Sequence, residues 1–299
     1  MIAVVGATGF TGRRIVAQLR NHYPDEELVA IVRSESRREV LANQQISFRT
    51  ADLADANALR QAFERARLVI SAISLAFGHA PNLVAALEAT KPERVIFFST
   101  TTVFSSVRTS TRDVLIQSER VIADSGLRAT LFRPTMVYGR PGDRNIERLL
   151  RFLRHSPLMP VLGPGTGIHQ PVHVDDLAIA VGQASANSKT IGRSYNLPGP
   201  RPMRFIELIR SAAAAVDRRP ILIHVPLWFA YPTVRAWSTT GLWPRIRADQ
   251  LLRLGEDKQA EADDAMRDFG YSPREFDQGV EEEAGLLGLV DRGHRAGRG

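Results

Sequence analysis

The chain has 299 residues, of which 44% are hydrophobic and 24% are charged, with no cysteine and a formal net charge of +7. This length suits one large α/β domain, or one domain with a smaller lobe. Without cysteine, disulfides, thiolate metal sites and a cysteine nucleophile are excluded. No apolar run is long enough for a transmembrane helix, and no targeting segment precedes the first apolar run, so we expect a cytoplasmic protein.

The first 33 residues have the pattern of a β-strand, a helix and a second strand. Residues 2–5 and 28–32 are apolar strand formers, and residues 13–21 are helical. The turn between the first strand and the helix carries glycines that allow a tight bend and close approach of a pyrophosphate to the backbone. The helix N-terminus favours an anion at the same place. This turn therefore predicts a nucleotide site formed by Gly6, Thr8, Gly9, Phe10, Thr11 and Gly12, although the spacing is G-x-x-G-x-x-G rather than G-x-G-x-x-G.

The residue that follows the second strand favours NADP over NAD. NAD sites usually place a carboxylate there to accept from the ribose 2′-hydroxyl. Here the strand leads into Arg33, whose planar guanidinium suits a 2′-phosphate. Arg13, directly after the turn, is expected to stack on or flank the adenine.

Strands and helices alternate through the first half of the chain. Because the strands are almost continuously apolar, we predict a doubly wound parallel sheet of Rossmann type, covered by helices on both faces. Predicted strands cover residues 46–50, 68–74, 95–98 and 129–132, and predicted helices cover residues 55–64, 81–89 and 112–125, with Asp55 as an N-cap.

Small and polar residues follow these strands, at the sheet edge where ligands bind in such folds. Asp52 and Leu53 are expected beside the adenine. The small stretch Ser71, Ala72 and Ile73 leaves room for the ribose and pyrophosphate. Ser99 and Thr100 bring hydroxyls to the expected position of the nicotinamide.

Several stretches resemble the short-chain dehydrogenase/reductase (SDR) superfamily, in its extended and atypical branches. They include the glycine turn, Phe98-Ser99-Thr100-Thr101-Thr102-Val103-Phe104, and the Arg133-Pro134 to Tyr138-Gly139 stretch. The resemblance implies that Thr100 takes the place of the catalytic hydroxyl. It also implies that the loop with Pro134 and Val137 faces the nicotinamide, while Tyr138 is expected to be a packing residue.

The chain departs from this family at its acid/base pair. Extended SDR enzymes carry Tyr-x-x-x-Lys on the helix after the fifth strand, and alignment on Glu119 places Thr111 and Leu115 at those two positions. A threonine hydroxyl has no ionisation near neutral pH, so it is a poor proton shuttle. The usual family chemistry therefore does not transfer directly.

The second half of the chain is predicted to form a smaller α/β lobe, giving domains at residues 1–160 and 161–285 and a basic tail at 286–299. Some later elements are expected to return to the first domain. The Trp-rich segment 221–244 is expected to pack in this lobe, with a protein or membrane-surface contact as the alternative. Nucleic-acid binding is not expected, and the oligomeric state stays open.

Two polar clusters in this half are candidate sites. His173 with Asp175 and Asp176 is expected to cap a helix rather than to bind a metal, and no metal site is predicted. Arginines that could hold the diphosphate of a nucleotide sugar are Arg144, Arg148, Arg201 and Arg204.

These observations leave two functions open. The first is an NADP-dependent oxidoreductase or a nucleotide-sugar epimerase or dehydratase. The alternative is a non-catalytic or weakly catalytic NADP-binding protein, such as the redox-sensing atypical SDR proteins or the SDR-like accessory subunit of respiratory complex I. The missing Tyr-x-x-x-Lys pair favours the alternative.

Overall fold

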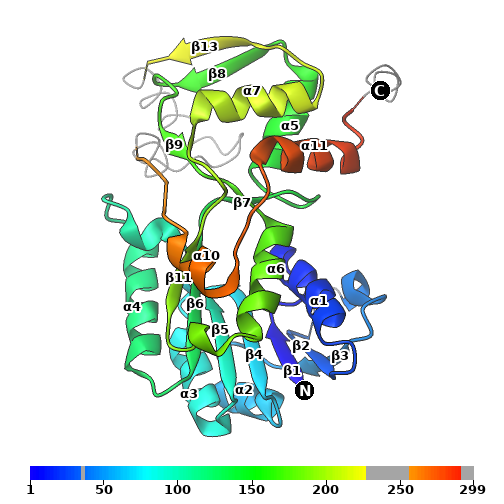
Figure 1. Cartoon of the computed structure of the whole chain (residues 1–299), viewed down its shortest axis with the longest axis vertical. Helices are drawn as coiled ribbons and strands as arrows, with labels where there is room; N and C mark the ends of the chain where they lie inside the picture. The colour runs from blue at the N-terminus through cyan, green and yellow to red at the C-terminus, as the bar shows by residue number, and fades with distance from the viewer. Residues whose placement is uncertain (35–37, 227–255, 291–299) are drawn as a thin grey trace. The chain divides into compact units, whose positions relative to one another are not determined.

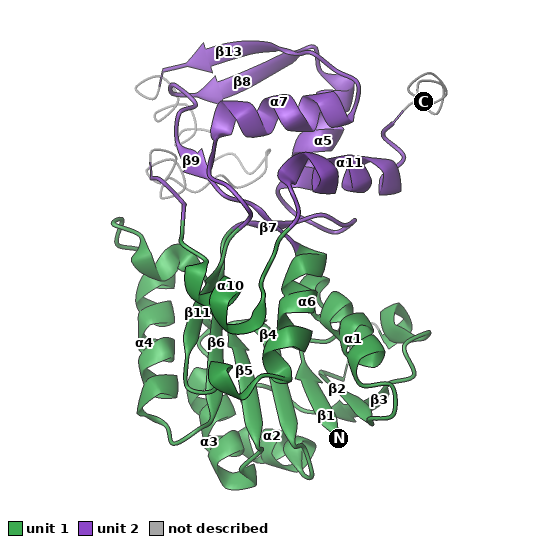
Figure 2. Ribbon diagram, in the orientation of Figure 1, with its two compact units in different colours: residues 1–135, 174–198, 260–273 green, residues 136–173, 199–259, 274–299 purple. Residues whose placement is uncertain are grey.

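The structure is a computed structural model that describes residues 1–34, 38–226 and 256–290. The chain divides into two compact units (Figure 2). Unit 1 comprises Met1–Thr135, Val174–Pro198 and Ala260–Pro273, and unit 2 comprises Met136–His173, Gly199–Gln259 and Arg274–Gly299. None of the helices in the described ranges is long and apolar enough to cross a membrane.

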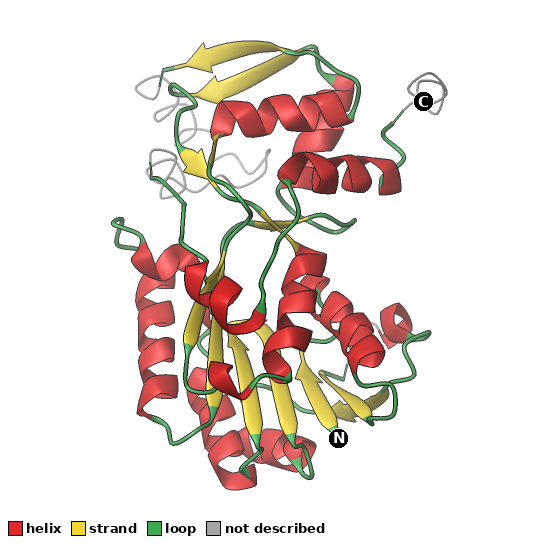
Figure 3. Cartoon of the chain, in the orientation of Figure 1, coloured by secondary structure: helices red, strands yellow, loops and turns green. Residues whose placement is uncertain are grey.

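Unit 1 contains a seven-stranded sheet with the order β11-β6-β5-β4-β1-β2-β3. Figure 3 shows the strands in yellow and the helices in red. Every neighbouring pair in this sheet is parallel. The chain winds outward from β1 through β2 and β3, then crosses to β4 on the other side of β1. The predicted doubly wound parallel sheet is confirmed. The strands are β1 (Ile2–Val5), β2 (Leu28–Val32), β3 (Ser47–Thr50), β4 (Leu68–Ser74), β5 (Arg94–Phe98), β6 (Ala129–Pro134) and β11 (Ser194–Leu197).

Helices cover both faces of this sheet (Figure 1). Successive strand side chains point to opposite faces, so a strand buried on both sides is apolar throughout, as β1 and β2 are. Ala3 and Val5 face the core formed with α2, α3 and α4, while α1 and α6 pack together on the other face. The helices are α1 (Phe10–His22), α2 (Ala56–Phe63), α3 (Ala80–Thr90), α4 (Ser110–Asp124), α6 (Val174–Ser185) and α10 (Asp263–Phe269), with 3₁₀ turns η1 (Arg38–Leu41), η2 (Leu75–Phe77), η3 (Thr101–Phe104) and η4 (Ser188–Thr190).

The N-terminus of α2 illustrates how local sequence fixes an element. Asp55 is the N-cap, and its Oδ1 accepts hydrogen bonds from the backbone N–H groups of Asn57 and Ala58 at 2.9 and 3.0 Å. These bonds satisfy donors that the first helical turn otherwise leaves unpaired. The predicted cap at Asp55 is confirmed.

Unit 2 has a core of its own, made where α5, α7 and α11 pack together. Ile146, Leu150 and Leu153 of α5 are buried in this core. The elements of unit 2 are β7 (Val137–Tyr138), α5 (Ile146–His155), β8 (Leu158–Leu162), β9 (Ile168–His169), β10 (Val172–His173), β12 (Met203–Arg204), α7 (Phe205–Ala215), β13 (Ile221–Val225) and α11 (Phe276–Leu286).

The boundary between the units differs from the predicted one at residue 160, which lies inside unit 2. Unit 2 begins at Met136 because the apolar face of α5 packs on α7 and α11. The predicted tail also begins too early, because Leu289 is buried and Leu287 and Val290 pack against the same core. Residues 291–299 of that tail, and residues 227–244 of the Trp-rich segment, lie outside the described residues.

Candidate functional site

The turn between β1 and α1 is tightly folded on itself. Gly6 has a φ of 76°, in the left-handed region that favours glycine, and its carbonyl oxygen accepts from the N–H of Gly9 at 2.9 Å. A Cβ atom at position 12 would lie only 2.1 Å from that carbonyl oxygen. Gly12 is therefore needed for the helix to begin directly against the turn.

The N-terminus of α1 has the features of an anion site. Its N-cap is Gly9, which is exposed and provides no side-chain hydrogen bond, and no acidic residue lies in the first turn. Arg13 follows, with a buried Nε that has no hydrogen-bond partner in the described chain. The first-turn N–H groups leave the turn suited to a pyrophosphate. The expected contact of Arg13 with the adenine stays a prediction. Thr8, Phe10 and Thr11 complete the turn and are half-buried.

Two arginines gather at the ends of β2 and β3. Arg33 directly follows β2 and is exposed. The register pairs Val32 with Thr50, and the Oγ1 of Thr50 accepts from Nη2 of Arg38 at 3.2 Å. Arg38 also lies over the ring of Phe48, 5.4 Å from its centre. Arg38 is not recognisable as a candidate from the sequence alone, because its partner Thr50 lies 12 residues away.

The segment after β3 lies at the next position along the edge. Asp52 is exposed, and its Oδ1 accepts from the N–H of Ala54 at 2.9 Å. The carbonyl oxygen of Leu53 accepts from Nδ2 of Asn82 at 2.9 Å, which ties this segment to α3. The predicted contact of Asp52 with an adenine amino group stays a prediction.

The end of β4 packs against the glycine turn. A Cβ atom on Gly6 would lie 2.6 Å from Cγ1 of Ile73, so these two predicted residues are in contact. Ser71 is buried, and within the described chain its Oγ has no hydrogen-bond partner. An unpaired buried hydroxyl is unusual in a folded protein and indicates a ligand or water partner. Ala72, between them, is half-buried.

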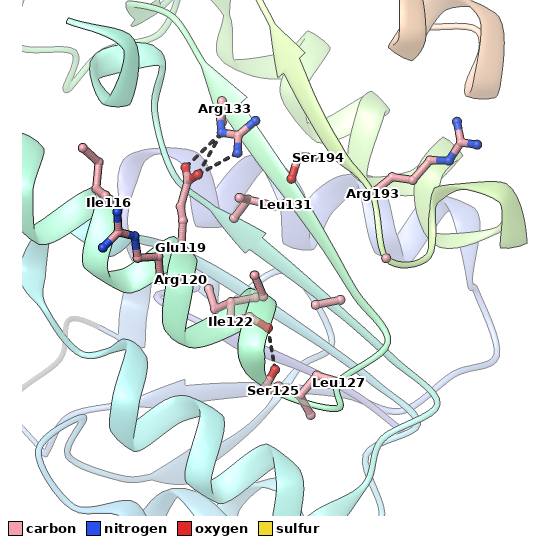
Figure 4. Close-up of a pocket in the computed structure, with 13 residues that line it drawn as sticks. Ile116, Glu119, Arg120, Ile122, Ser125, Leu127, Leu131, Arg133, Arg193 and Ser194 are labelled. Atoms are coloured by element: carbon pink, nitrogen blue, oxygen red, sulfur yellow. Dashed lines mark hydrogen bonds and ion pairs between the residues drawn. The ribbon is translucent and has the colours of Figure 1, made fainter.

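Ser99, at the end of β5, takes part in a polar network that the sequence analysis did not foresee. Its hydroxyl donates to Oε1 of Glu119 at 2.5 Å, and Arg133 binds the same carboxylate through Nε and Nη2 (Figure 4). The network borders a cavity of about 370 Å³ beside α4. Because its proton is used in this bond, Ser99 offers a cofactor only its lone pairs or its backbone.

Thr100 caps the 3₁₀ turn η3. Its Oγ1 accepts from the N–H of Thr102 at 3.4 Å and lies 3.3 Å from the Oγ1 of Thr102. On α4, Thr111 is exposed and Leu115 is fully buried in the core. Helix α4 therefore supplies no phenol and no ammonium group near Thr100, as its sequence predicts.

The remaining predicted residues lie in both units. Pro134 is buried at the end of β6 in unit 1, whereas Val137 belongs to unit 2, where it pairs with Val172. Tyr138 is fully buried, and its hydroxyl donates to the carbonyl oxygen of Phe276 at 3.4 Å. The prediction that Tyr138 is a packing residue is confirmed.

The cluster at residues 173–176 forms no common site. Nε2 of His173 lies 3.1 Å from the carbonyl oxygen of Gly139, in unit 2. Asp175 and Asp176 lie in the first turn of α6, where a carboxylate faces the positive end of the helix dipole, and Asp175 pairs with Arg14. Among the described residues, no three His, Asp or Glu side chains gather as metal ligands.

The four arginines predicted for a diphosphate are all exposed in unit 2. Arg201 pairs with Glu275 at 3.5 Å. Their proposed ligand stays a prediction. The four residues are Arg144, Arg148, Arg201 and Arg204.

Comparison with known proteins agrees with this geometry. The model of a family described as "NAD(P)H-binding" matches residues 6–151, which include the glycine turn and strands β2 to β6. Quinone oxidoreductase 2 of Escherichia coli is 33% identical over 202 residues, which are 67% of this chain and 68% of that protein. The chain belongs to the atypical and extended SDR family. It therefore carries an NAD(P)H-binding domain.

Other SDR proteins match with lower identity. The mitochondrial NADH dehydrogenase [ubiquinone] 1 alpha subcomplex subunit 9 of Arabidopsis thaliana is 26% identical over 79% of this chain and 61% of that protein. A crystal structure of the NADPH-dependent quinone oxidoreductase QOR2 from Escherichia coli matches with a TM-score of 0.74 and 21% identity, covering 96% of this chain and 99% of the other.

An SDR epimerase structure has a similar fold. The UDP-glucuronic acid 4-epimerase of Bacillus cereus, in complex with UDP-glucuronic acid and NAD, matches with a TM-score of 0.75 and 16% identity, covering 96% of this chain and 98% of the other. At these identities the solved structures support the fold of the chain and do not define its substrate.

Proposed function

We propose that this SDR protein is an NADP(H)-dependent oxidoreductase that reduces a quinone or a similar conjugated carbonyl compound. The proposal rests on one observation. Unit 1 contains the glycine turn before α1, but its helix α4 lacks the acid/base pair of the family. NADPH held by the residues of this turn would provide the hydride for this reduction. Reduction of a quinone by hydride produces a hydroquinone anion, which water can protonate, so no enzymic acid is required.

The chain's own residues bind and orient the reactants in this proposal. The glycine turn holds the pyrophosphate, and Arg13, Asp52 and Leu53 hold the adenine. Ser71 and the backbone of Ala72 and Ile73 border the ribose. Pro134 and Ser99 border the nicotinamide, and the hydroxyl of Thr100 donates a hydrogen bond to the acceptor's carbonyl oxygen.

Epimerisation of a nucleotide sugar fits these residues less well. That reaction begins by removing a proton from a sugar hydroxyl, which requires a base of suitable pKa. Thr111 is exposed and Leu115 is buried in the core, so neither residue can serve as this base. The second candidate function is a non-catalytic NADP-binding role. The absence of the acid/base pair at Thr111 and Leu115 supports this role, and so does the 26% identity to the NADH dehydrogenase subunit.

Preference for NADP over NAD is expected from the two arginines at the ends of β2 and β3. Arg33→Asp should lower NADPH affinity by about 10- to 100-fold, the contribution of one charged hydrogen-bond pair, and leave NADH affinity nearly unchanged. Calorimetric titration of both cofactors tests this. Arg128→Asp, at an exposed position before β6, is the matched control. Equal affinity of the wild type for both cofactors would show that Arg33 does not select the phosphate.

Turnover separates the candidate functions. The wild type should oxidise NADPH with quinones and leave nucleotide sugars unchanged. Thr100→Val should slow quinone reduction by about 10- to 100-fold through loss of the hydrogen-bond donor, while Tyr138→Phe should have little effect. Stopped-flow oxidation of NADPH across both substrate panels measures this. Epimer formation at ordinary enzyme rates of about 1–10³ s⁻¹ would contradict the proposal. Tight NADPH binding without any oxidation would favour the non-catalytic role.

A further inference from the structure

A two-stranded sheet in unit 2 has one face that carries only apolar side chains. Strands β8 and β13 are parallel, with Leu158 beside Ile221 and Pro160 beside Ile223. Leu158, Ile221 and Ile223 are 43%, 66% and 44% exposed. Because alternate residues point to one side of a strand, these side chains share a face. We define the outer face of β8–β13 as Leu158, Pro160, Leu162, Ile221, Ile223 and Val225.

The opposite face of the same sheet accounts for the core contacts of these strands. Val161 is fully buried in the core of unit 2, and Met159 and Leu222 pack against that core. A two-stranded sheet that buries one face normally carries polar residues on the other. The outer face has none, so burial in unit 2 does not explain its composition.

Cationic residues lie at one end of this face. The strands are parallel, so the segments that lead into them meet at the same edge, where the N–H of Ile221 donates to the carbonyl oxygen of Pro157 at 2.9 Å. Nε of Arg218 donates to the carbonyl oxygen of Arg154 at 3.2 Å. Arg218 and Arg219 are exposed. The segments that lead into the two strands are residues 154–157 and 217–220. Their charged side chains are Arg154, Asp217, Arg218 and Arg219, and their one other titratable side chain is His155.

We propose that the outer face of β8–β13 binds the surface of an anionic membrane. In this arrangement the leucine and isoleucine side chains enter the boundary between headgroups and acyl chains, and the arginines at the edge contact lipid phosphates. Binding to an anionic membrane surface requires an apolar face next to cationic side chains. The outer face and the exposed Arg218 and Arg219 at its edge provide this combination. The proposal rests on residues 154–162 and 217–225, and it is independent of the catalytic proposal.

Vesicle sedimentation of the full chain tests this. The wild type should sediment with vesicles of phosphatidylglycerol and phosphatidylcholine, and much less with phosphatidylcholine alone. Ile221→Asp should weaken binding about tenfold or more, because it places a charge at the most exposed position of the outer face. Ile179→Asp is the matched control, because Ile179 is 39% exposed on α6 of unit 1.

A second variant separates the charge contribution from the apolar one. Arg219→Glu should weaken binding to the anionic vesicles about fivefold or more and reduce its salt dependence, and Arg128→Glu should not. Thermal melting verifies that each variant is folded. The proposal is overturned if the wild type does not sediment with anionic vesicles, or if folded Ile221→Asp binds these vesicles as tightly as the wild type does. It is also overturned if Ile221→Asp dissociates a wild-type oligomer in the absence of lipid, because a second copy would then cover the face.

Discussion

Gly9→Val should lower the affinity for NADPH by at least about a hundredfold, which corresponds to about 2.7 kcal/mol, while the chain remains folded. Gly9 has φ −73° and ψ 172°, an extended conformation that valine also adopts, and it is exposed. A Cβ atom there would meet only the carbonyl oxygen of Gly6, at 3.1 Å. The rest of the valine side chain would occupy the space in front of the α1 N-terminus that a pyrophosphate requires.

Two further glycine variants make this experiment specific. Gly126→Val is the matched control, because a Cβ atom at Gly126 has no neighbour within 4 Å and the residue lies away from the turn. Gly12→Ala should instead destabilise unit 1, because its Cβ atom would lie 2.1 Å from the backbone of Gly6. Calorimetric titration with NADPH and thermal melting measure both effects. A folded Gly9→Val protein with wild-type NADPH affinity would contradict the assignment of the turn.

The sheet of unit 1 could be predicted from sequence because its strands are apolar on both faces. Residues 68–74 were predicted as a strand and form β4 with the same bounds. Gly6 directly follows β1 and Pro198 directly follows β11, and each such signal is local. In unit 2, strands such as β9 and β10 have two residues each, which is too short for any periodic pattern to indicate them.

Contacts between distant residues could not be predicted in the same way. Glu119 served only to align α4 with the family, yet its carboxylate binds Ser99 and Arg133, which lie 20 and 14 residues away in sequence. Arg38 reaches Thr50 only because β2 and β3 pair. Both contacts depend on strand order and register, which the composition of a single segment does not specify.

Glu283, on α11, provides the second large expected effect. Its side chain is completely buried, and its Oε2 accepts from the N–H of Gly139 at 3.1 Å. Burial, together with the negative charge of Asp143, raises the pKa of Glu283 to about 8. Glu147 raises the pKa further, and Arg140 partly opposes this. In the folded state, therefore, Glu283 keeps its proton at neutral pH.

The sign of the pH effect follows from this raised pKa. The ordinary pKa of the carboxyl is 4.5. Between pH 4.5 and about 8, the unfolded chain has released a proton that the folded chain retains. Within this window, an increase of one pH unit lowers the free energy of unfolding by up to about 1.4 kcal/mol. The contribution of Glu283 is complete below pH 4.5 and is lost as the pH rises to about 8.

Glu283→Gln removes this titration and keeps the side-chain volume and the oxygen that accepts from Gly139. The variant should match the wild type near pH 4.5 and should be more stable by about 2–4 kcal/mol at pH 8. Denaturant unfolding across this pH range measures the difference, with hydrogen exchange of α11 used to follow unit 2 separately. Glu281→Gln, on the exposed side of the same helix, is the control. If the stabilities of Glu283→Gln and the wild type differ by a constant amount at every pH, Glu283 is ionised in the folded protein, and the pH dependence of unit 2 comes from another group.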